Sequence, residues 1–461
     1  MVVEYIVAFL ILAVYGWLVY YAVKGGNMTF GFFFAGLMWT LISLIAWHSG
    51  LLNADFIAAN ASYAETPFLN QLNSVFQTAI RNQGLQSVDI ITGAWFGAVM
   101  LETGISQTLI RKTVEFGGDR PVLVTILLDL VVAALFTSIF GIGAVMALGI
   151  IVLPILFSLG IPKVVAVISY LFAVAAGNFM NPVLLAAHFT TYGTDANGVV
   201  QYNYQMWASN FAWIASIVGT IFVVIMSLVL LKGGKKKNVK AWAAPADAYQ
   251  NDEGRKNPPN IALLFPFMPT LTILLLKTEN IPTFLFWGWA TLIVCGYCKG
   301  FNNAAASFSK TLMKSVVDSA GLIVFLIMLG CVASSIKLAQ PFLNLVISPI
   351  IPQNAPVVLC IAVMILAPLA LFRGPLTMYG TGGPIFLMLA GIGYPRTFLF
   401  PLMYVPSICM NMAACPTQSY VAWGISYAKI DTKEYMKKSI PWGWIFCILL
   451  EIVVIFVATK Y

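Results

Sequence analysis

Long apolar runs separated by short polar loops dominate the chain. Ten runs have about the 20 residues that a helix needs to cross a membrane. They lie at about 4–23, 28–52, 88–110, 163–188, 206–231, 260–277, 281–299, 315–335, 396–414 and 440–459. Two further apolar stretches, 121–161 and 355–394, are broken by Gly and Pro and fit no single straight helix. The pattern predicts an all-α polytopic membrane protein with about ten spans and two hairpins.

The composition agrees with a membrane protein and excludes several other classes. Of the 461 residues, 60% are apolar and only 9% are Asp, Glu, Lys or Arg, with a mean hydropathy of +0.89. An ordinary soluble domain carries roughly 25% charged residues. A soluble enzyme, a disordered chain and a nucleic-acid binder are therefore excluded. The net charge of +8 comes from cations in short loops between apolar runs, which is the pattern that orients membrane proteins.

One long polar segment divides the chain into three parts. The segment 232–259 reads as a solvated linker between an N-terminal part, 1–231, and a C-terminal part, 260–461. Placing this linker in the cytoplasm puts most of the 25 Lys and Arg residues on the same side and both termini outside. We expect a multi-pass protein of the bacterial inner membrane.

The two parts resemble each other as an internal repeat. A shift of 233 residues places Gly141 on Gly374, Gly149 on Gly382 and Asn178 on Asn411, without gaps. The predicted topology starts the first copy outside and the second inside, so the repeats are expected to be inverted. Inverted repeats with interrupted helices at matching places point to a secondary transporter and to its substrate site.

The broken stretches are the expected location of the chemistry, because backbone groups cannot stay unpaired in hydrocarbon. Glycines cluster at 140–149 in the first copy and at 372–384 in the second. We expect each stretch, 121–161 and 355–394, to form a re-entrant hairpin with its tip near the bilayer middle. Two full spans joined by a tight turn are the alternative, and the loop charges do not separate the two.

A second interruption follows each hairpin, at 177–182 and at 410–419. Half-helices that meet there would direct their dipole ends at a common point, where positive N-termini suit a carboxylate and freed carbonyls suit Na⁺. The alternative is a purely structural Pro kink that packs against a neighbouring helix. The candidate substrate-binding residues are Arg373, Gly374, Thr377, Thr381, Gly382, Asn178, Asn181, Asn411, Thr417, Gln418, Ser419, Gly141 and Gly143.

Arg373 is the most informative single residue. It lies next to the predicted tip of the second hairpin, where a buried Arg costs at least about 2.5–3.5 kcal/mol on insertion scales. Its planar fork of donors matches a carboxylate. We expect it to bind an anion, although an ion pair with an intramembrane acid would also explain it.

Three acids are candidates for ion coupling: Glu102, Asp129 and Asp318. Glu102 lies inside an apolar run and is the best candidate for a proton carrier, with pairing to Arg373 or to a neighbouring helix as the alternative. His188 follows the break at 177–182. A structural role is expected for it, and a proton-relay role stays open.

Motifs of enzymes and cofactor proteins are missing from the sequence. There is no Gly-rich phosphate loop, no H-E-x-x-H and no nucleophile elbow, and the linker is too short for a nucleotide-binding domain. Cys295 and Cys298 form a C-x-x-C, but without a second pair or a nearby His we expect packing residues and no metal site. We therefore expect no enzyme and no cofactor beyond a coupling ion, H⁺ or Na⁺.

Several motifs resemble the ion transporter superfamily, which holds gluconate, citrate and C4-dicarboxylate permeases. They are W-F-G-A-V-M-L-E-T-G-I (95–105), the basic loop 109–121, L-G-I-P (159–162), A-C-P-T-Q-S-Y-V-A-W-G (414–424) and Y-M-K-K-S-I-P-W (435–442). The resemblance implies two inverted repeats, a homodimer with a scaffold and a moving transport domain, and organic anion uptake coupled to H⁺ or Na⁺. The Ser-Asn-Thr hairpin signature of the dicarboxylate/sodium symporter branch is absent, and Gly-Thr-Gly-Gly at 380–383 is the nearest approach.

The sequence thus predicts a secondary active transporter for a small organic anion that works by alternating access. A cation/proton antiporter of related architecture is the alternative, in which the acids near the spans carry the ions and Arg373 is a structural counter-ion. A channel or a membrane scaffold is a third reading, and the paired breaks speak against the scaffold.

Overall fold

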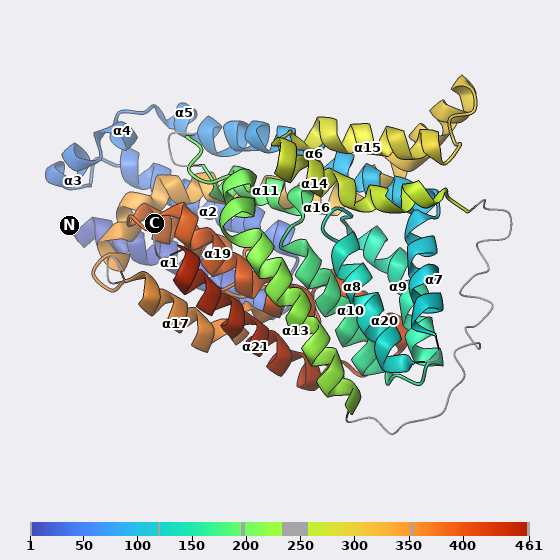
Figure 1. The fold of residues 1–461 in the computed structure, drawn as a ribbon. Coiled ribbons are helices and arrows are strands. Elements are labelled where there is room, and N and C mark those ends of the chain that lie inside the picture. The colour runs from blue at the N-terminus through green and yellow to red at the C-terminus, as the bar shows by residue number, and fades with distance from the viewer. Residues whose placement is uncertain (1, 119, 195–198, 233–256, 352–354, 459–461) are drawn as a thin grey trace.

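The computed structural model describes residues 2–118, 120–194, 199–232, 257–351 and 355–458 (Figure 1). Helices form nearly all of this part of the chain, and one isolated β-bridge joins Thr194 to Val200. The predicted all-α polytopic class is therefore confirmed. Most of the predicted linker 232–259 lies outside the described residues.

A first group of helices surrounds the long helix α16, which packs against α1, α2 and α6. In Figure 1, α6, α14 and α15 lie along one edge of the molecule, in agreement with their mutual contacts. The members of this α16 group are α1 (Val2–Val23), α2 (Met28–His48), α6 (Ala79–Glu102), η6 (Asn260–Phe267), α14 (Met268–Leu276), α15 (Asn280–Val294) and α16 (Phe301–Ile347). Four short elements connect α2 to α6: α3 (Ala54–Ala59), α4 (Ala61–Ala64), α5 (Phe68–Asn73) and the π-helical η1 (Ser74–Thr78).

A second group forms around α10, which packs against α8, α9, α13 and α20. Its first half comprises α7 (Ile105–Gly117), α8 (Pro121–Leu135), α9 (Ile142–Ser158), α10 (Lys163–Asn178), α11 (Pro182–Tyr192), α12 (Tyr204–Trp207), η2 (Ala208–Ala212) and α13 (Trp213–Lys232). Its second half comprises α17 (Pro356–Leu366), η7 (Ala367–Arg373), α18 (Gly382–Gly391), α19 (Arg396–Pro406), η8 (Ser407–Met412), α20 (Ser419–Ala428) and α21 (Thr432–Ala458).

Helix length separates clear spans from shorter segments. Six helical segments of the described chain are long and apolar enough to cross a membrane, and up to eight if each of two bent pairs counts as one span. The bent pairs are α6 with α7, at 55°, and α10 with α11, at 62°. The predicted spans 260–277, 281–299 and 396–414 are among those that form helical segments of fewer than 18 residues, namely Asn260–Leu276, Asn280–Val294 and 396–412 (α19 with η8).

Both broken stretches fold as two helices joined by an irregular tip, as predicted. In the first hairpin α8 and α9 flank the tip 136–141, and in the second α17 with η7 and α18 flank the tip 374–381. The returning arm α18 has 10 residues, which span about 15 Å. Because a hydrocarbon core is about 30 Å thick, this length favours a re-entrant hairpin over a pair of full spans.

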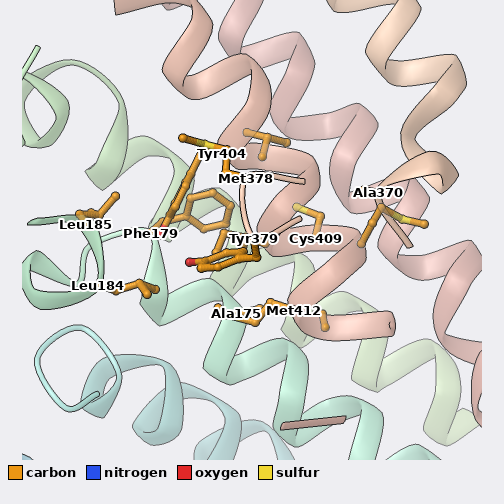
Figure 2. Packing of buried hydrophobic residues seen from close by; sticks show 14 of the residues in the cluster. Ala175, Phe179, Leu184, Leu185, Ala370, Met378, Tyr379, Tyr404, Cys409 and Met412 are labelled. Atoms are coloured by element: carbon orange, nitrogen blue, oxygen red, sulfur yellow. The ribbon is translucent and has the colours of Figure 1, made fainter. Parts of the chain in front are cut away.

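The two interrupted helices form the centre of the α10 group. Every residue of α10 from Val164 to Asn178 is buried, and so is every residue from Phe398 to Met412 in α19 and η8. Phe179 and Tyr404 pack their rings 5.9 Å apart where the two helices meet (Figure 2). Burial on all sides explains why these buried segments carry no charged residue and no polar face.

One helix boundary differs strongly from the sequence prediction. The apolar run 315–335 is the middle of α16, a helix of 47 residues that begins at Phe301. The N-terminal extension carries polar residues such as Asn302 and Lys310, which end the apolar run. Polarity on its own does not end a helix, and lysine is a good helix former.

Candidate functional site

A cavity of about 520 Å³ lies between the two helix groups, and both hairpin tips line it. We call it the tip cavity. The α16 group contributes the loop and first turn at 25–29 and one face of α16. The α10 group contributes the two tips and the second interruption. The lining residues are Ala22, Gly25, Gly26, Asn27, Met28, Thr29, Phe140, Gly141, Ile142, Leu184, Asp318, Gly321, Leu322, Phe325, Arg373, Tyr379, Met412, Thr417, Gln418, Ser419 and Tyr420.

The backbone at the second hairpin tip is held in an uncommon conformation that places Arg373 on the cavity wall. Phe372 and Arg373 have φ of 54° and 58°, the left-handed region that side chains with a Cβ seldom adopt. The Arg373 carbonyl accepts a hydrogen bond from the Thr381 backbone N–H at 2.9 Å, which closes the tip loop on itself. Strained backbone of this kind persists where the surrounding structure fixes it, and it clusters at functional sites.

Side chains of the second interruption fix this tip. The Asn411 amide donates to the Ala370 carbonyl at 3.2 Å, and the Phe372 backbone N–H donates to Cys415 Sγ at 3.1 Å. Both contacts join residues more than 40 positions apart. The interrupted helix therefore sets the position of the Arg373 backbone.

The first hairpin tip ends at Gly141, which has φ of 103° and precedes α9 without a side-chain cap. Gly141 and Ile142 line the cavity at this helix N-terminus. The Asp318 carboxylate lies against Gly143 so closely that a Cβ at this position would overlap it. Asp318 thus sits beside the N-terminus of α9.

Three helix N-termini end at the tip cavity. They are those of α2, α9 and α20, whose first residues or caps line it: Asn27 to Thr29, Gly141 to Ile142, and Gln418 to Tyr420. Each N-terminus is equivalent to roughly +0.5 elementary charge, and the C-terminus of α1, whose Ala22 also lines the cavity, is equivalent to roughly −0.5. The helix ends together supply roughly +1 before side chains are counted. Arg373 adds a positive charge and Asp318 removes one. The described walls therefore make the cavity electropositive.

Arg373 and Asp318 share the cavity without neutralising each other. Both side chains are half-buried, and within the described chain neither forms an ion pair. A half-buried guanidinium without a carboxylate partner is costly in a membrane protein unless a ligand supplies the negative charge.

Six of the sequence-predicted residues line the tip cavity, and the others do not. Gly141, Arg373, Thr417, Gln418, Ser419 and Asp318 line it. The residues Gly374, Thr377, Thr381 and Gly382 are buried inside the second tip, and Gly143 contacts Asp318 from behind. Asn411, as described above, supports that tip.

The asparagines of the first interruption are engaged in holding the fold. The Asn181 side chain caps α11 by accepting from the Val183 and Leu184 backbone N–H groups at 3.1 Å. Its amide also donates to the carbonyls of Phe136 and Ile139 in the first tip, at 2.8 and 3.0 Å. Asn181 therefore mirrors the tip-supporting role of Asn411.

Asn178 differs from the other two asparagines. Its amide donates to Met412 Sδ at 3.0 Å, while its side-chain oxygen is buried and has no hydrogen-bond partner among the described residues. Asn178 joins the two interruptions directly. It does not line the tip cavity.

Of the three predicted coupling acids, Asp318 is the one at the cavity. Glu102 is the last residue of α6, because Gly104, with φ of 74°, breaks the helix after it. The Glu102 carboxylate forms an ion pair with Lys310 at 2.6 Å. The run 88–110, predicted as one apolar run of spanning length with Glu102 inside it, is bent by 55° between α6 and α7, so Glu102 lies at a helix end. Asp129 is buried in α8 and accepts from the Ser169 and Ser227 hydroxyls at 2.5 and 2.7 Å.

The sequence analysis missed one wall of the cavity. The segment Gly25 to Thr29 connects α1 to α2, and Asn27 caps α2 by accepting from the Thr29 and Phe30 backbone N–H groups. An N-cap Asn after two glycines was a visible signal for a helix start. Nothing in the sequence indicated that this start faces the hairpin tips.

Glu451 in α21 gives a stability prediction. It is fully buried, and neither carboxyl oxygen has a hydrogen-bond partner within the described chain. Removing a buried unsatisfied polar group relieves about 1–3 kcal/mol, so Glu451→Leu should raise the apparent melting temperature in detergent. Asp129→Leu is the matched control and should lower it, because two serine hydroxyls lose their acceptor. A lower melting temperature for Glu451→Leu would contradict this account.

Comparison with known proteins identifies the fold. The chain is similar to the crystal structure of the YdaH transporter of Alcanivorax borkumensis, whose topology is described as unusual. The two match with a TM-score of 0.55 over 89% of this chain and 90% of that one, at 12% sequence identity. No family model and no curated protein sequence matches the chain. At this identity the similarity establishes a shared membrane-protein fold, and it does not single out the permeases of the ion transporter superfamily.

Proposed function

We propose that the chain is a secondary active transporter that moves a small organic anion across the membrane by alternating access. The single observation that carries the proposal is the tip cavity. One arginine and three helix N-termini face the same volume there, between the two helix groups. The fold shared with a protein described as a transporter supports transport as the activity.

The charges of the cavity favour a carboxylate as the transported group. Arg373 offers a planar set of donors that fits two carboxylate oxygens, and the N-termini of α9 and α20 add backbone N–H groups. The hydroxyls of Thr417 and Ser419 lie on the same wall and suit a hydroxy acid. A cation substrate would meet this positive field with a single compensating acid, which disfavours the antiporter alternative.

Asp318 is the coupling residue in this proposal. It is the one acid among the described lining residues, and it lies against the first hairpin while Arg373 belongs to the second. A proton or Na⁺ bound at Asp318 would remove the negative charge that competes with the anion for Arg373. Binding of the coupling ion and of the anion would therefore favour each other.

The position of the cavity fits alternating access. It lies between the α16 group and the α10 group, so a movement of one group against the other would open or close it. In the orientation predicted from the positive charges, the loop at 25–29 faces the cytoplasm. We therefore propose that the structure is an inward-facing state.

Ligand-induced stabilisation tests the proposal on purified protein. We expect gluconate, citrate or succinate to raise the apparent melting temperature. A ligand at 100 times its Kd stabilises the state it binds by about 2.7 kcal/mol. The matched amide, which keeps the shape and loses the charge, should have no effect. Repeating the series with and without Na⁺, and at two pH values, identifies the coupling ion.

Uptake of the same labelled acids into proteoliposomes then separates transport from binding. An anion transporter shows saturable uptake and counterflow. A cation/proton antiporter shows neither with organic acids, and that result would overturn the proposal.

A further inference from the structure

A second cavity, of about 370 Å³, lies at the far end of the second hairpin. We call it the Lys337–Arg396 cavity after its two cations. Its walls come from α16, from the end of α18 and from the start of α19. The lining residues are Tyr63, Gln201, Ile336, Lys337, Gln340, Leu387, Ala390, Gly391, Tyr394, Pro395, Arg396 and Thr397.

The helix α16 connects the two cavities. Asp318 lines the tip cavity and Lys337 lines the second one. Nineteen residues separate them, about 28 Å along a straight helix. The hairpin arm α18, which leads from the second tip to Gly391 in the second cavity, is only about 15 Å long, half of a hydrocarbon core of about 30 Å. The second cavity therefore lies near one surface, and the tips lie nearer the middle of the core. Between them α16 is largely buried, from Phe325 to Ile336.

One face of α11 runs from the first cavity to the second. Leu184, His188 and Tyr192 are spaced four residues apart and lie on this face. Leu184 lines the tip cavity, and the Tyr192 carbonyl accepts a hydrogen bond at 2.6 Å from Arg396, which lines the second cavity. His188 lies between them, one helical turn from each.

The polar side-chain atoms of His188 and Tyr192 have no hydrogen-bond partners within the described chain. Both ring nitrogens of His188 and the hydroxyl of Tyr192 are buried without a hydrogen bond. The imidazole is packed among aromatic rings, with centroids 4.8 Å from Tyr379, 5.9 Å from Tyr404 and 6.1 Å from Tyr192. Buried donors and acceptors are nearly always paired in native proteins, so unpaired ones call for a ligand or another conformational state.

Tyr379 separates His188 from the tip cavity. It lines that cavity and also contacts the imidazole ring. Figure 2 shows its side chain between Met412 and Leu184, with the oxygen on the Leu184 side. On the other side, Gly383 of α18 lies against the Tyr192 hydroxyl, and a Cβ there would overlap it. The second hairpin therefore covers His188 and Tyr192 on this face.

We propose that the two cavities are the two ends of one route for the organic anion, and that it follows the Leu184–His188–Tyr192 face of α11. Tyr379 and the second hairpin close this route in the present state. Lys337 and Arg396 receive the carboxylate near the surface at the second cavity, and His188 and Tyr192 donate hydrogen bonds to it on the way. This inference rests on the proposed function and adds a second binding station and a course between the stations.

The variant His188→Leu tests the route, with whichever of gluconate, citrate and succinate stabilises the wild-type protein. Half-saturation of thermal stabilisation should stay within about twofold, because the tip cavity is unchanged. Uptake should fall at least about tenfold, the factor that corresponds to one lost hydrogen bond of about 1.4 kcal/mol. The apparent melting temperature should not fall, because the replaced ring had no hydrogen bond. Tyr192→Phe should behave in the same way.

Phe189→Leu is the matched control. Phe189 is a neighbouring buried residue of α11 that packs on Phe400, with ring centroids 4.4 Å apart, and lies off the route. This variant should lose stability and keep its uptake per folded molecule. Wild-type uptake in both His188→Leu and Tyr192→Phe would overturn the route and leave the proposed function intact. Absence of carboxylate uptake by the wild-type protein would overturn both.

A labelling experiment tests the far end of the route independently. Thr397→Cys places a thiol in the Lys337–Arg396 cavity. Cys295→Ser and Cys298→Ser remove the two half-exposed native thiols, while the other five are buried. We expect a membrane-impermeant thiol reagent to block uptake in this variant, and the stabilising carboxylate to slow the reaction. Modification that leaves uptake unchanged would overturn the second station.

Discussion

Arg373→Ala is expected to abolish saturable uptake while the protein stays inserted and folded. Removing one partner of a buried charge pair costs about 2–5 kcal/mol. Each 1.4 kcal/mol changes an affinity tenfold, so anion binding should weaken roughly 30-fold to several thousand-fold. The loss should appear in both thermal stabilisation and uptake, because the guanidinium acts in binding.

The left-handed backbone conformation at position 373 allows a substitution that separates loss of the side chain from backbone strain. Arg373 adopts φ of 58°, which every residue with a Cβ resists and which Asn tolerates better than most. Arg373→Asn should therefore fold at least as well as Arg373→Ala and transport equally poorly. Arg373→Lys keeps the charge and loses the planar fork, so it should recover part of the activity.

Phe372→Asn is the matched control, because it changes a residue with the same strained backbone conformation and removes no charge. Phe372 is the adjacent left-handed residue, with φ of 54°, and it does not line the tip cavity. This variant should keep its uptake if the guanidinium is what matters at the tip. Wild-type uptake in Arg373→Ala or Arg373→Asn would refute the assignment of Arg373 to anion binding.

The hairpins and the interrupted helices could be predicted because their signal is local. Gly141, Pro182 and the glycines at 380–383 interrupt apolar runs, and a backbone that cannot continue a helix in lipid must turn or line a cavity. The structure places helix ends at each of these positions. The shift that pairs Asn178 with Asn411 also marked the two segments that the fold buries most completely.

The composition of the site could be predicted only in part because it depends on packing between distant segments. Glu102 and Asp318 are equivalent as acids in apolar surroundings, and only the fold pairs the first with Lys310 and directs the second to the cavity. The three helix N-termini that meet at the cavity belong to helices far apart in the sequence. The first and last of their caps, Asn27 and Gln418, are 391 residues apart. No spacing rule covers such a distance.

The second large effect is expected at Asn181, which the structure assigns to the fold rather than to the cavity wall. Its side chain makes four hydrogen bonds, two that cap α11 and two that hold the carbonyls of Phe136 and Ile139. A lost N-cap costs about 1 kcal/mol, and each buried group left unpaired costs about 1–3 kcal/mol. We expect Asn181→Ala to lower the free energy of unfolding by about 3 kcal/mol or more, measured as a drop in apparent melting temperature.

Two further variants separate the cap from the tip contacts. Asn181→Asp keeps an acceptor for the α11 N–H groups and loses both donors, so it sets carboxyl oxygens against the Phe136 and Ile139 carbonyls. It should be as unstable as the alanine variant. Asn203 caps α12 through a single bond to the Met206 N–H at 3.0 Å and is exposed, so Asn203→Ala should cost only about 1 kcal/mol. Equal losses for Asn181→Ala and Asn203→Ala would show that the tip contacts contribute nothing. The first hairpin, and with it the N-terminus of α9 at the cavity, would then need another support.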